Sequence, residues 1–246
     1  MISFEHVTKT YAKSNTRAVD DLSLTTQNGE IFGFIGPNGA GKTTTIKILV
    51  GILKPDSGRI TIDGMSYEQD PIRLKSILGF VPDSPEIYDR LTGIEYLNFI
   101  ADIYSVPEQK RRDNIEKYLN MFGLEKVVGE GIQSYSHGMK QKLVLASALL
   151  HEPRLWILDE PLTGLDPKAS HLLKEEMRAH CKRGNTVFFS THVLEVAEQL
   201  CDRIGIIDNG KLIASGTLEE LRGKAQSEAS LESIFFKLTD AYEGGE

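Results

Sequence analysis

The sequence is poor in cysteine, with two residues, Cys181 and Cys201, in a chain of 246. Their spacing fits neither a C-x-x-C motif nor a metal-binding pattern, so both are predicted to be reduced structural thiols and not parts of a disulfide framework. Long apolar runs are also missing. The stretch from 143 to 150 is far shorter than the roughly 20 residues that cross a bilayer. We therefore expect no membrane-spanning segment.

An excess of positive charge is also missing, since 35 acidic residues outnumber 28 basic ones and the formal net charge is -7 at pH 7. This balance argues against sequence-independent binding to phosphate backbones, and we expect no nucleic-acid partner. Residues 1–6 have neither the basic nor the apolar region of an export signal, so we expect a cytoplasmic protein. The hydrophobic fraction of 40% is sufficient for a full globular core.

Short alternating runs at 2–7 and 22–25 predict antiparallel β structure near the N-terminus. The near-continuous apolar run 31–35 is typical of a strand buried on both faces. Similar runs follow at 155–158, 186–189 and 204–207, with a helical pattern at 168–183. Alternation of strands and helices indicates an α/β fold around a covered, mostly parallel sheet.

The pattern in residues 84–152 is helical throughout, with Pro107 suited to a helix start and Gly123 to a helix end. We predict an inserted helical subdomain there, within a core formed by 1–83 and 153–222. A C-terminal helical extension is predicted at 223–246, with an apolar face formed by Leu231, Ile234, Phe235 and Leu238. This face indicates a packed helix or, alternatively, a partner surface.

A phosphate-binding motif follows the strand predicted at 31–35. The pattern G-x-x-x-x-G-K-[ST] is matched by Gly36, Pro37, Asn38, Gly39, Ala40, Gly41, Lys42 and Thr43. Glycines let backbone N–H groups turn toward phosphate oxygens, and the following helix N-terminus favours anions. We expect Lys42 to reach the β- and γ-phosphates of ATP, Thr43 to bind Mg²⁺ and Thr44 to contact the α-phosphate. The alternative is a glycine turn that merely caps a helix.

Two carboxylates, Asp159 and Glu160, follow the strand predicted at 155–158. Ligands of such sheets lie at the carboxyl ends of the strands. Asp159 is expected to hold Mg²⁺, directly or through water, and Glu160 to act as the general base on the attacking water. The alternative is an acidic strand end at the surface.

With these residues identified, the chain resembles the ATP-binding subunit of ABC transporters over essentially its whole length. The segment Tyr-Ser-His-Gly-Met at 135–139 is similar to the family signature L-S-G-G-Q and keeps Ser136 and Gly138. The resemblance implies a P-loop NTPase core of RecA type. It also implies that the signature caps an ATP held by another subunit, in a head-to-tail dimer with a second copy or a homologous cassette. From its own residues, Ser136 is a helix N-cap.

The same resemblance assigns further roles. It implies that 163–166 is the D-loop along the dimer seam, that His192 is the switch histidine at the γ-phosphate, and that Tyr11 stacks on adenine. Without it, 163–166 is a helix-entry turn before Pro167, His192 is a polar residue in a turn and Tyr11 is a packing residue.

Two positions depart from the family pattern. Asp83, at the end of a loop predicted at 79–83, stands where the family usually has glutamine, and it could still accept a metal-bound water. In the signature, His137 replaces glycine and Met139 replaces glutamine. These departures leave open a catalytically weak regulator.

The resemblance implies an ATPase that docks on a separate integral membrane permease, at the inner face of the cell membrane. The C-terminal pattern favours an exporter. The alternative is a cytosolic ABC ATPase that moves no solute and acts as a nucleotide-switched binding module.

Overall fold

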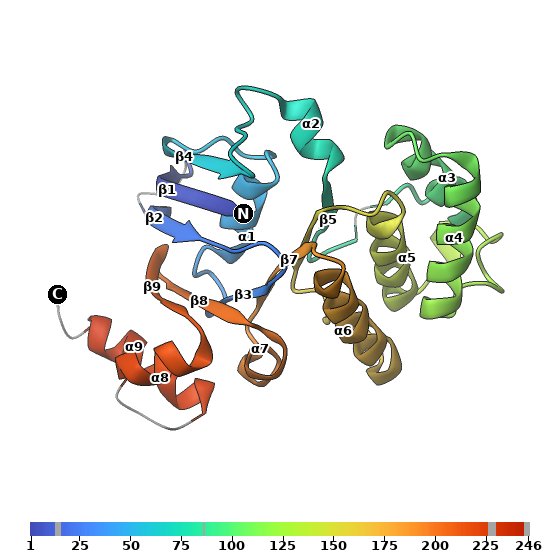
Figure 1. The fold of residues 1–246 in the computed structure, drawn as a ribbon. Helices are drawn as coiled ribbons and strands as arrows, with labels where there is room; N and C mark the ends of the chain where they lie inside the picture. The colour runs from blue at the N-terminus through green and yellow to red at the C-terminus, as the bar shows by residue number, and fades with distance from the viewer. Residues whose placement is uncertain (13–15, 86, 226–229, 244–246) are drawn as a thin grey trace.

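The computed structural model describes residues 1–12, 16–85, 87–225 and 230–243, which form an α/β fold with two sheets (Figure 1). The antiparallel sheet has the order β2 (Arg17–Thr25), β1 (Ile2–Thr10), β4 (Ser57–Ile62). The larger sheet has the order β5 (Leu78–Val81), β6 (Leu155–Asp159), β7 (Thr186–Thr191), β3 (Ile31–Ile35), β8 (Arg203–Asp208), β9 (Lys211–Gly216). Its strands are parallel except β9, which runs antiparallel to β8. The predicted fold class is confirmed.

Helix α1 (Lys42–Leu49) packs in the hydrophobic core shared by the two sheets. Ile2 and Phe4 of the small sheet, Phe32 and Phe34 of β3, and Ile46 of α1 are at most 1% exposed in this core. All residues of β3 and β6 are buried, as expected for central strands covered on both faces. The core therefore holds the ends of β3 and β6 in fixed positions.

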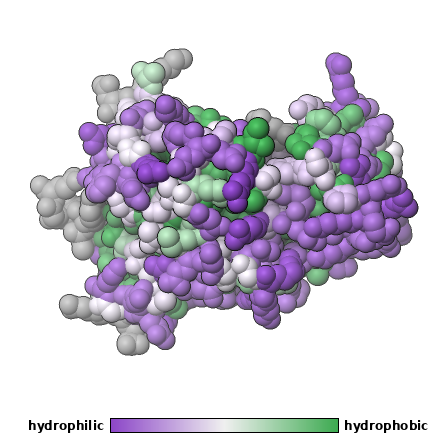
Figure 2. Space-filling view, turned by 45° about the horizontal axis from the view of Figure 1, so that its top comes forward, coloured by the Kyte–Doolittle hydropathy of each residue, from purple (hydrophilic) through white to green (hydrophobic). Residues whose placement is uncertain are grey.

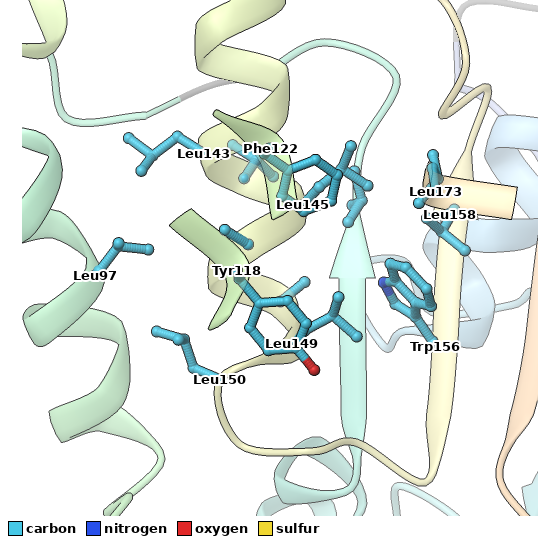
Figure 3. Close-up of a cluster of buried hydrophobic side chains, with 14 of the residues drawn as sticks. Leu97, Tyr118, Phe122, Leu143, Leu145, Leu149, Leu150, Trp156, Leu158 and Leu173 are labelled. Atoms are coloured by element: carbon cyan, nitrogen blue, oxygen red, sulfur yellow. The ribbon is translucent and has the colours of Figure 1, made fainter. Parts of the chain in front are cut away.

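The helical part of the chain lies to one side of the sheets (Figure 1). It contains α3 (Gly93–Ile103), α4 (Glu108–Phe122), the short 3₁₀ helix η1 (Ile132–Ser134) and α5 (His137–Leu149). In Figure 3, leucines of α5 lie between the helices and Trp156 and Leu158 of β6, so α5 joins this part to the large sheet. Pro107 and Gly123 flank α4, as predicted.

The prediction of helix throughout 84–152 is wrong for the loops that connect the helices in this range. Thr92 starts α3 with a capping box, and Gly123 ends α4 in the left-handed conformation, so turns and bends flank these helices. The loop predicted at 79–83 is also wrong in part. Residues 79–81 belong to β5, which pairs with β6.

Five further helices lie among the described residues. They are α2 (Pro71–Ser76), α6 (Pro167–Lys182), α7 (Leu194–Leu200), α8 (Leu218–Ala225) and α9 (Leu231–Glu243). Leu231 and Ile234 of α9 are 0% exposed and pack with residues of α7 and β8, so the predicted packed helix is confirmed. Of the C-terminal range, 226–229 and 244–246 lie outside the described residues. Among the described helices, none combines the length and the apolar character needed to cross a membrane.

Candidate active site

The loop 36–41 joins the buried end of β3 to α1 and so lies at the carboxyl edge of the large sheet. Gly41 is the N-cap of α1, with φ of 106°, and a Cβ atom there would lie 2.3 Å from the carbonyl oxygen of Ala18. The helix receives no hydrogen bond from a capping side chain. Its first N–H groups lack intrahelical partners, so this terminus fits an anion such as phosphate.

A cavity of about 360 Å³ opens over this loop, within the size range of small-molecule sites. Its walls are formed by Tyr11, Ala18, Pro37, Asn38, Gly39, Gly41, Lys42, Thr43, Thr44, Asp83 and Glu160. Two predicted motif residues lie outside this lining: Gly36, whose carbonyl accepts a hydrogen bond from Lys42, and Ala40, which is 2% exposed. The rest of the predicted motif and both Tyr11 and Asp83 are thus gathered around one cavity.

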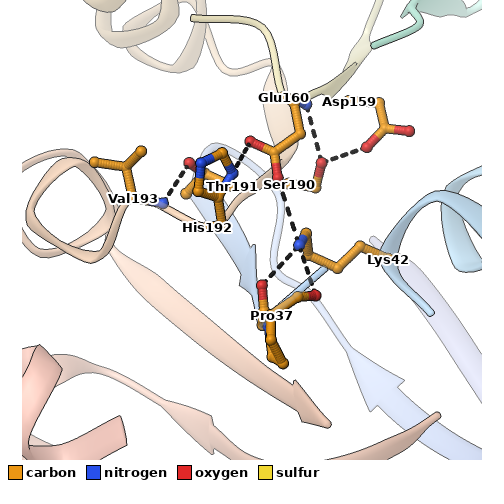
Figure 4. Close-up of polar contacts among 9 residues, drawn as sticks. Pro37, Lys42, Asp159, Glu160, Ser190, Thr191, His192 and Val193 are labelled. Atoms are coloured by element: carbon orange, nitrogen blue, oxygen red, sulfur yellow. Dashed lines mark hydrogen bonds and ion pairs between the residues drawn. The ribbon is translucent and has the colours of Figure 1, made fainter. Parts of the chain in front are cut away.

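Lys42 is 6% exposed, and its ammonium group donates hydrogen bonds to the carbonyls of Gly36 (2.6 Å) and Pro37 (3.1 Å). The same Nζ atom lies 3.4 Å from Oε1 of Glu160 (Figure 4). That carboxylate oxygen is buried and has no hydrogen-bond partner within the part of the chain described. A buried cation is therefore held at the cavity by weak neutral acceptors and one carboxylate, an environment that a phosphate group would complete.

Glu160 stands between Lys42 and His192. Its other carboxylate oxygen, Oε2, lies 3.0 Å from Nδ1 of His192, which follows the end of β7. The backbone of Glu160 has φ of 48°, a left-handed conformation that non-glycine residues rarely adopt. Such strain is characteristic of functional sites.

Asp159 is 1% exposed at the end of β6. Burial raises its pKa above the usual aspartate value, against hydrogen bonds from Ser190 and Thr43, and the negative charges of Asp83 and Glu160 raise it further. Carboxylate and hydroxyl oxygens are ligands that suit Mg²⁺, which proteins commonly bind through one or two carboxylates plus substrate phosphates. Asp159 and Thr43 therefore fit this ion. The described residues contain no cluster of three His, Cys, Asp or Glu able to hold a metal by itself.

Tyr11 borders the open side of the cavity. Its hydroxyl lies 3.3 Å from Oγ1 of Thr44, and the residue is 42% exposed. The ring is thus anchored at its polar end and accessible elsewhere.

Ser136 and Gly138 do not line this cavity. Ser136 is the N-cap of α5 and accepts a hydrogen bond from the N–H of Met139 (3.3 Å), as its own residues predicted. The His137 ring lies against Gly164, since a Cβ atom at Gly164 would be 2.8 Å from Cδ2 of His137. The signature segment and the turn 163–166 therefore touch within one chain.

The turn 163–166 is held on its other side by Asp166. Its carboxylate accepts a hydrogen bond from Lys142 of α5 (2.6 Å) and another from the N–H of Ala169 (2.9 Å), which caps α6. Pro167 is the first residue of α6, as the helix-entry interpretation predicted.

The sequence pattern of one known family, described as ABC transporter, matches residues 19–163. This chain belongs to the ABC transporter family. It is an ATP-binding cassette of that family, an ATPase, and the resemblance found in its motifs is confirmed.

Relatives match all or nearly all of the cassette. It is 36% identical to the ABC-type transporter ATP-binding protein EcsA of Bacillus subtilis, over 100% of this chain and 99% of that protein. It is 34% identical to the linearmycin resistance ATP-binding protein LnrL of the same species, over 98% of this chain and 77% of that protein.

Among solved structures, an ATP-binding subunit of an ABC transporter matches with a TM-score of 0.92 and 34% identity, over 97% of this chain and 99% of that one. A dimeric ATP-binding cassette in a post-hydrolysis state, bound to ADP and Pi, matches with a TM-score of 0.80 and 26% identity, over 89% and 99%.

Sequence reasoning missed Ser190 of the cassette, which contacts both residues of the acidic pair. It also missed Ala18, which lines the cavity. A signal for Ser190 was present, because it is a polar residue at the end of an apolar run, two positions before His192.

Proposed function

We propose that this cassette binds ATP with Mg²⁺ in the cavity over loop 36–41 and hydrolyses it to drive solute export through a separate membrane permease. The observation that carries the proposal is the position of Glu160, whose carboxylate lies between the buried cation of Lys42 and the ring of His192. A general base must lie where it can take a proton from water near the reacting phosphate.

Each residue has a role that its position supports. Lys42 and the backbone N–H groups of 36–43, of which Pro37 has none, bind the phosphates, and the ring of Tyr11 stacks on the adenine. Thr43 and Asp159 would hold Mg²⁺, and Asp83 could accept a hydrogen bond from a water bound to the ion. When bound, Mg²⁺ neutralises charge on the β- and γ-phosphate oxygens. Glu160 accepts a proton from the attacking water, and His192 keeps the carboxylate oriented.

The signature segment acts in a partner cassette. Ser136 and His137 are exposed and lie away from the cavity of their own chain. A second copy, or a homologous cassette, placed head to tail would bring Ser136 and Gly138 to this ATP. The related dimeric cassette with bound ADP and Pi supports such an assembly.

A permease would contact the helical part of the cassette. Tyr88, Phe99 and Ile103 are 60%, 41% and 59% exposed there, and the rings of Tyr88 and Phe99 meet edge to face. Figure 2 shows hydrophobic patches that interrupt a largely hydrophilic surface. Exposed apolar groups of this kind mark interaction sites. We place the cassette at the inner face of the cell membrane, with export favoured by the resistance function in the name of LnrL.

Glu160→Gln tests the mechanism because glutamine keeps the shape but accepts no proton. We expect ATP binding to be retained, steady-state turnover to fall by about 10²- to 10⁴-fold, and an ATP-trapped dimer to appear in light scattering. Glu175→Gln, at an exposed ion pair with Arg178 on α6, is the matched control and should leave turnover unchanged. Unchanged turnover of Glu160→Gln would show that the base is assigned to the wrong residue.

Affinity purification from membranes tests the partner. Co-purification with an integral membrane protein supports the transport function. Stable association with ribosomes or DNA, without a membrane partner, would contradict it.

A further inference from the structure

Ser190 lies where the two acidic residues of the site meet the neighbouring strand. In the parallel pairing of β6 with β7, it stands opposite Asp159, and it is 0% exposed. Its hydroxyl accepts a hydrogen bond from the backbone N–H of Glu160 (3.0 Å) and donates one to Oδ1 of Asp159 (2.5 Å) (Figure 4). One hydroxyl group therefore joins both carboxylate residues.

The bond to Glu160 matters because of the backbone conformation there. Glu160 has just left β6, so its N–H has no ladder partner, and its φ of 48° must be maintained by local contacts. Its carbonyl accepts a hydrogen bond from Thr163 (3.1 Å), and its N–H is held by Ser190. These two bonds determine the direction in which the side chain leaves the backbone, toward Lys42 and His192.

The bond to Asp159 has a separate effect. Ser190 occupies one side of the carboxylate, at Oδ1, and so orients the carboxylate plane relative to Thr43 and the cavity. Residues that hydrogen-bond to a metal ligand in this way typically determine its orientation.

We propose that Ser190 is a positioning residue of the ATPase site, which holds the metal-binding carboxylate and the general base in one fixed relation. The proposal rests on the proposed function of Asp159 and Glu160. It assigns to Ser190 no contact with ATP. Loss of its hydroxyl should therefore affect metal binding and turnover and leave metal-free nucleotide binding intact.

The test is Ser190→Ala. We expect kcat to fall by about 10- to 100-fold, and the affinity for Mn²⁺ in the presence of a non-hydrolysable ATP analogue to fall by a similar factor, read by electron paramagnetic resonance. The affinity for a fluorescent ATP analogue in EDTA should be unchanged. Ser190→Thr, which keeps the hydroxyl, should restore most of the turnover.

Thr186→Val is the matched control. Thr186 is a buried residue at the opposite end of the same strand, and its hydroxyl accepts a hydrogen bond from the N–H of Gly29 (3.1 Å). The Thr186→Val variant loses this hydrogen bond far from the cavity, so its turnover and its affinity for Mn²⁺ should match those of the wild type. Equal losses in Thr186→Val and Ser190→Ala would overturn the proposal, because the effect would then be general loosening of β7.

The proposal would also be overturned if Ser190→Ala folds and has the same turnover and the same affinity for Mn²⁺ as the wild type. If that variant is insoluble, Ser190→Cys replaces it, because a thiol is a weak donor of similar size and should show the same losses. Normal values in Ser190→Cys would contradict the proposal. Failure of the proposed function would give a different result. In that case the wild type would bind no ATP, or the Glu160→Gln variant would turn over ATP as fast as the wild type.

Discussion

His180 makes the cassette sensitive to acid. The residue lies on α6, is 1% exposed and meets Trp156 edge to face. Burial, aided by the positive charges of Arg183 and Lys117, lowers its pKa from 6.5 to about 4. His180 therefore binds a proton more readily in the unfolded chain than in the folded one. The free energy of unfolding has its full value above pH 6.5 and decreases as the pH falls toward 4. At pH 5.0 the linkage relation yields a loss of about 2 kcal/mol from this residue alone.

Urea unfolding at pH 7.5 and 5.0 measures this loss. The free energy of unfolding of the wild type should fall by about 2 kcal/mol more than that of His180→Gln, which binds no proton in this range. His171→Gln is the control, because His171 is exposed on the same helix. It should behave like the wild type. The reasoning is refuted if the wild type and His180→Gln lose the same free energy between the two pH values.

Two changes in the phosphate loop have expected outcomes. Lys42→Ala should weaken ATP binding by about 10- to 100-fold in titration calorimetry, because a hydrogen bond to a charged group contributes about 1.5–3 kcal/mol. Lys47→Ala, on the same helix, is the control and should leave the affinity for ATP unchanged. Equal affinities of the two variants would contradict the role of Lys42. Gly41→Ala should lower Tm and abolish ATP binding, since its Cβ would lie 2.3 Å from the Ala18 oxygen. Gly39 has φ of 85°, but a Cβ atom there would have no atom within 4 Å. Gly39→Ala should therefore lower Tm less than Gly41→Ala does, and a larger decrease in Tm for Gly39→Ala would contradict this reasoning.

The place of the two main motifs in the fold could be predicted because it depends on local sequence. A glycine loop after a buried strand, and two carboxylates after another, must both lie at the carboxyl edge of a parallel sheet. Both motifs do lie there, and the structure adds a contact that the motifs did not predict, 3.4 Å between Lys42 and Glu160.

Other features depend on pairings between distant segments and could not be predicted. Residues 79–81 look like a loop because the strand is short, and its partner β6 comes more than 70 residues later. The role of Ser190 needs the register of β6 against β7, which a single strand pattern does not contain. The contact of His137 with Gly164 likewise requires α5 to be placed against the turn before α6.

The strand order has a consequence for synthesis of the chain. β3, which ends in the phosphate loop, pairs with β7 on one side and β8 on the other. About 150 residues separate β3 from β7, and at 5–20 residues per second this takes roughly 8–30 s on the ribosome. During that time the most apolar strand of the sheet has no neighbour. The nucleotide pocket can therefore form only late in synthesis, after the last third of the polypeptide has begun to emerge.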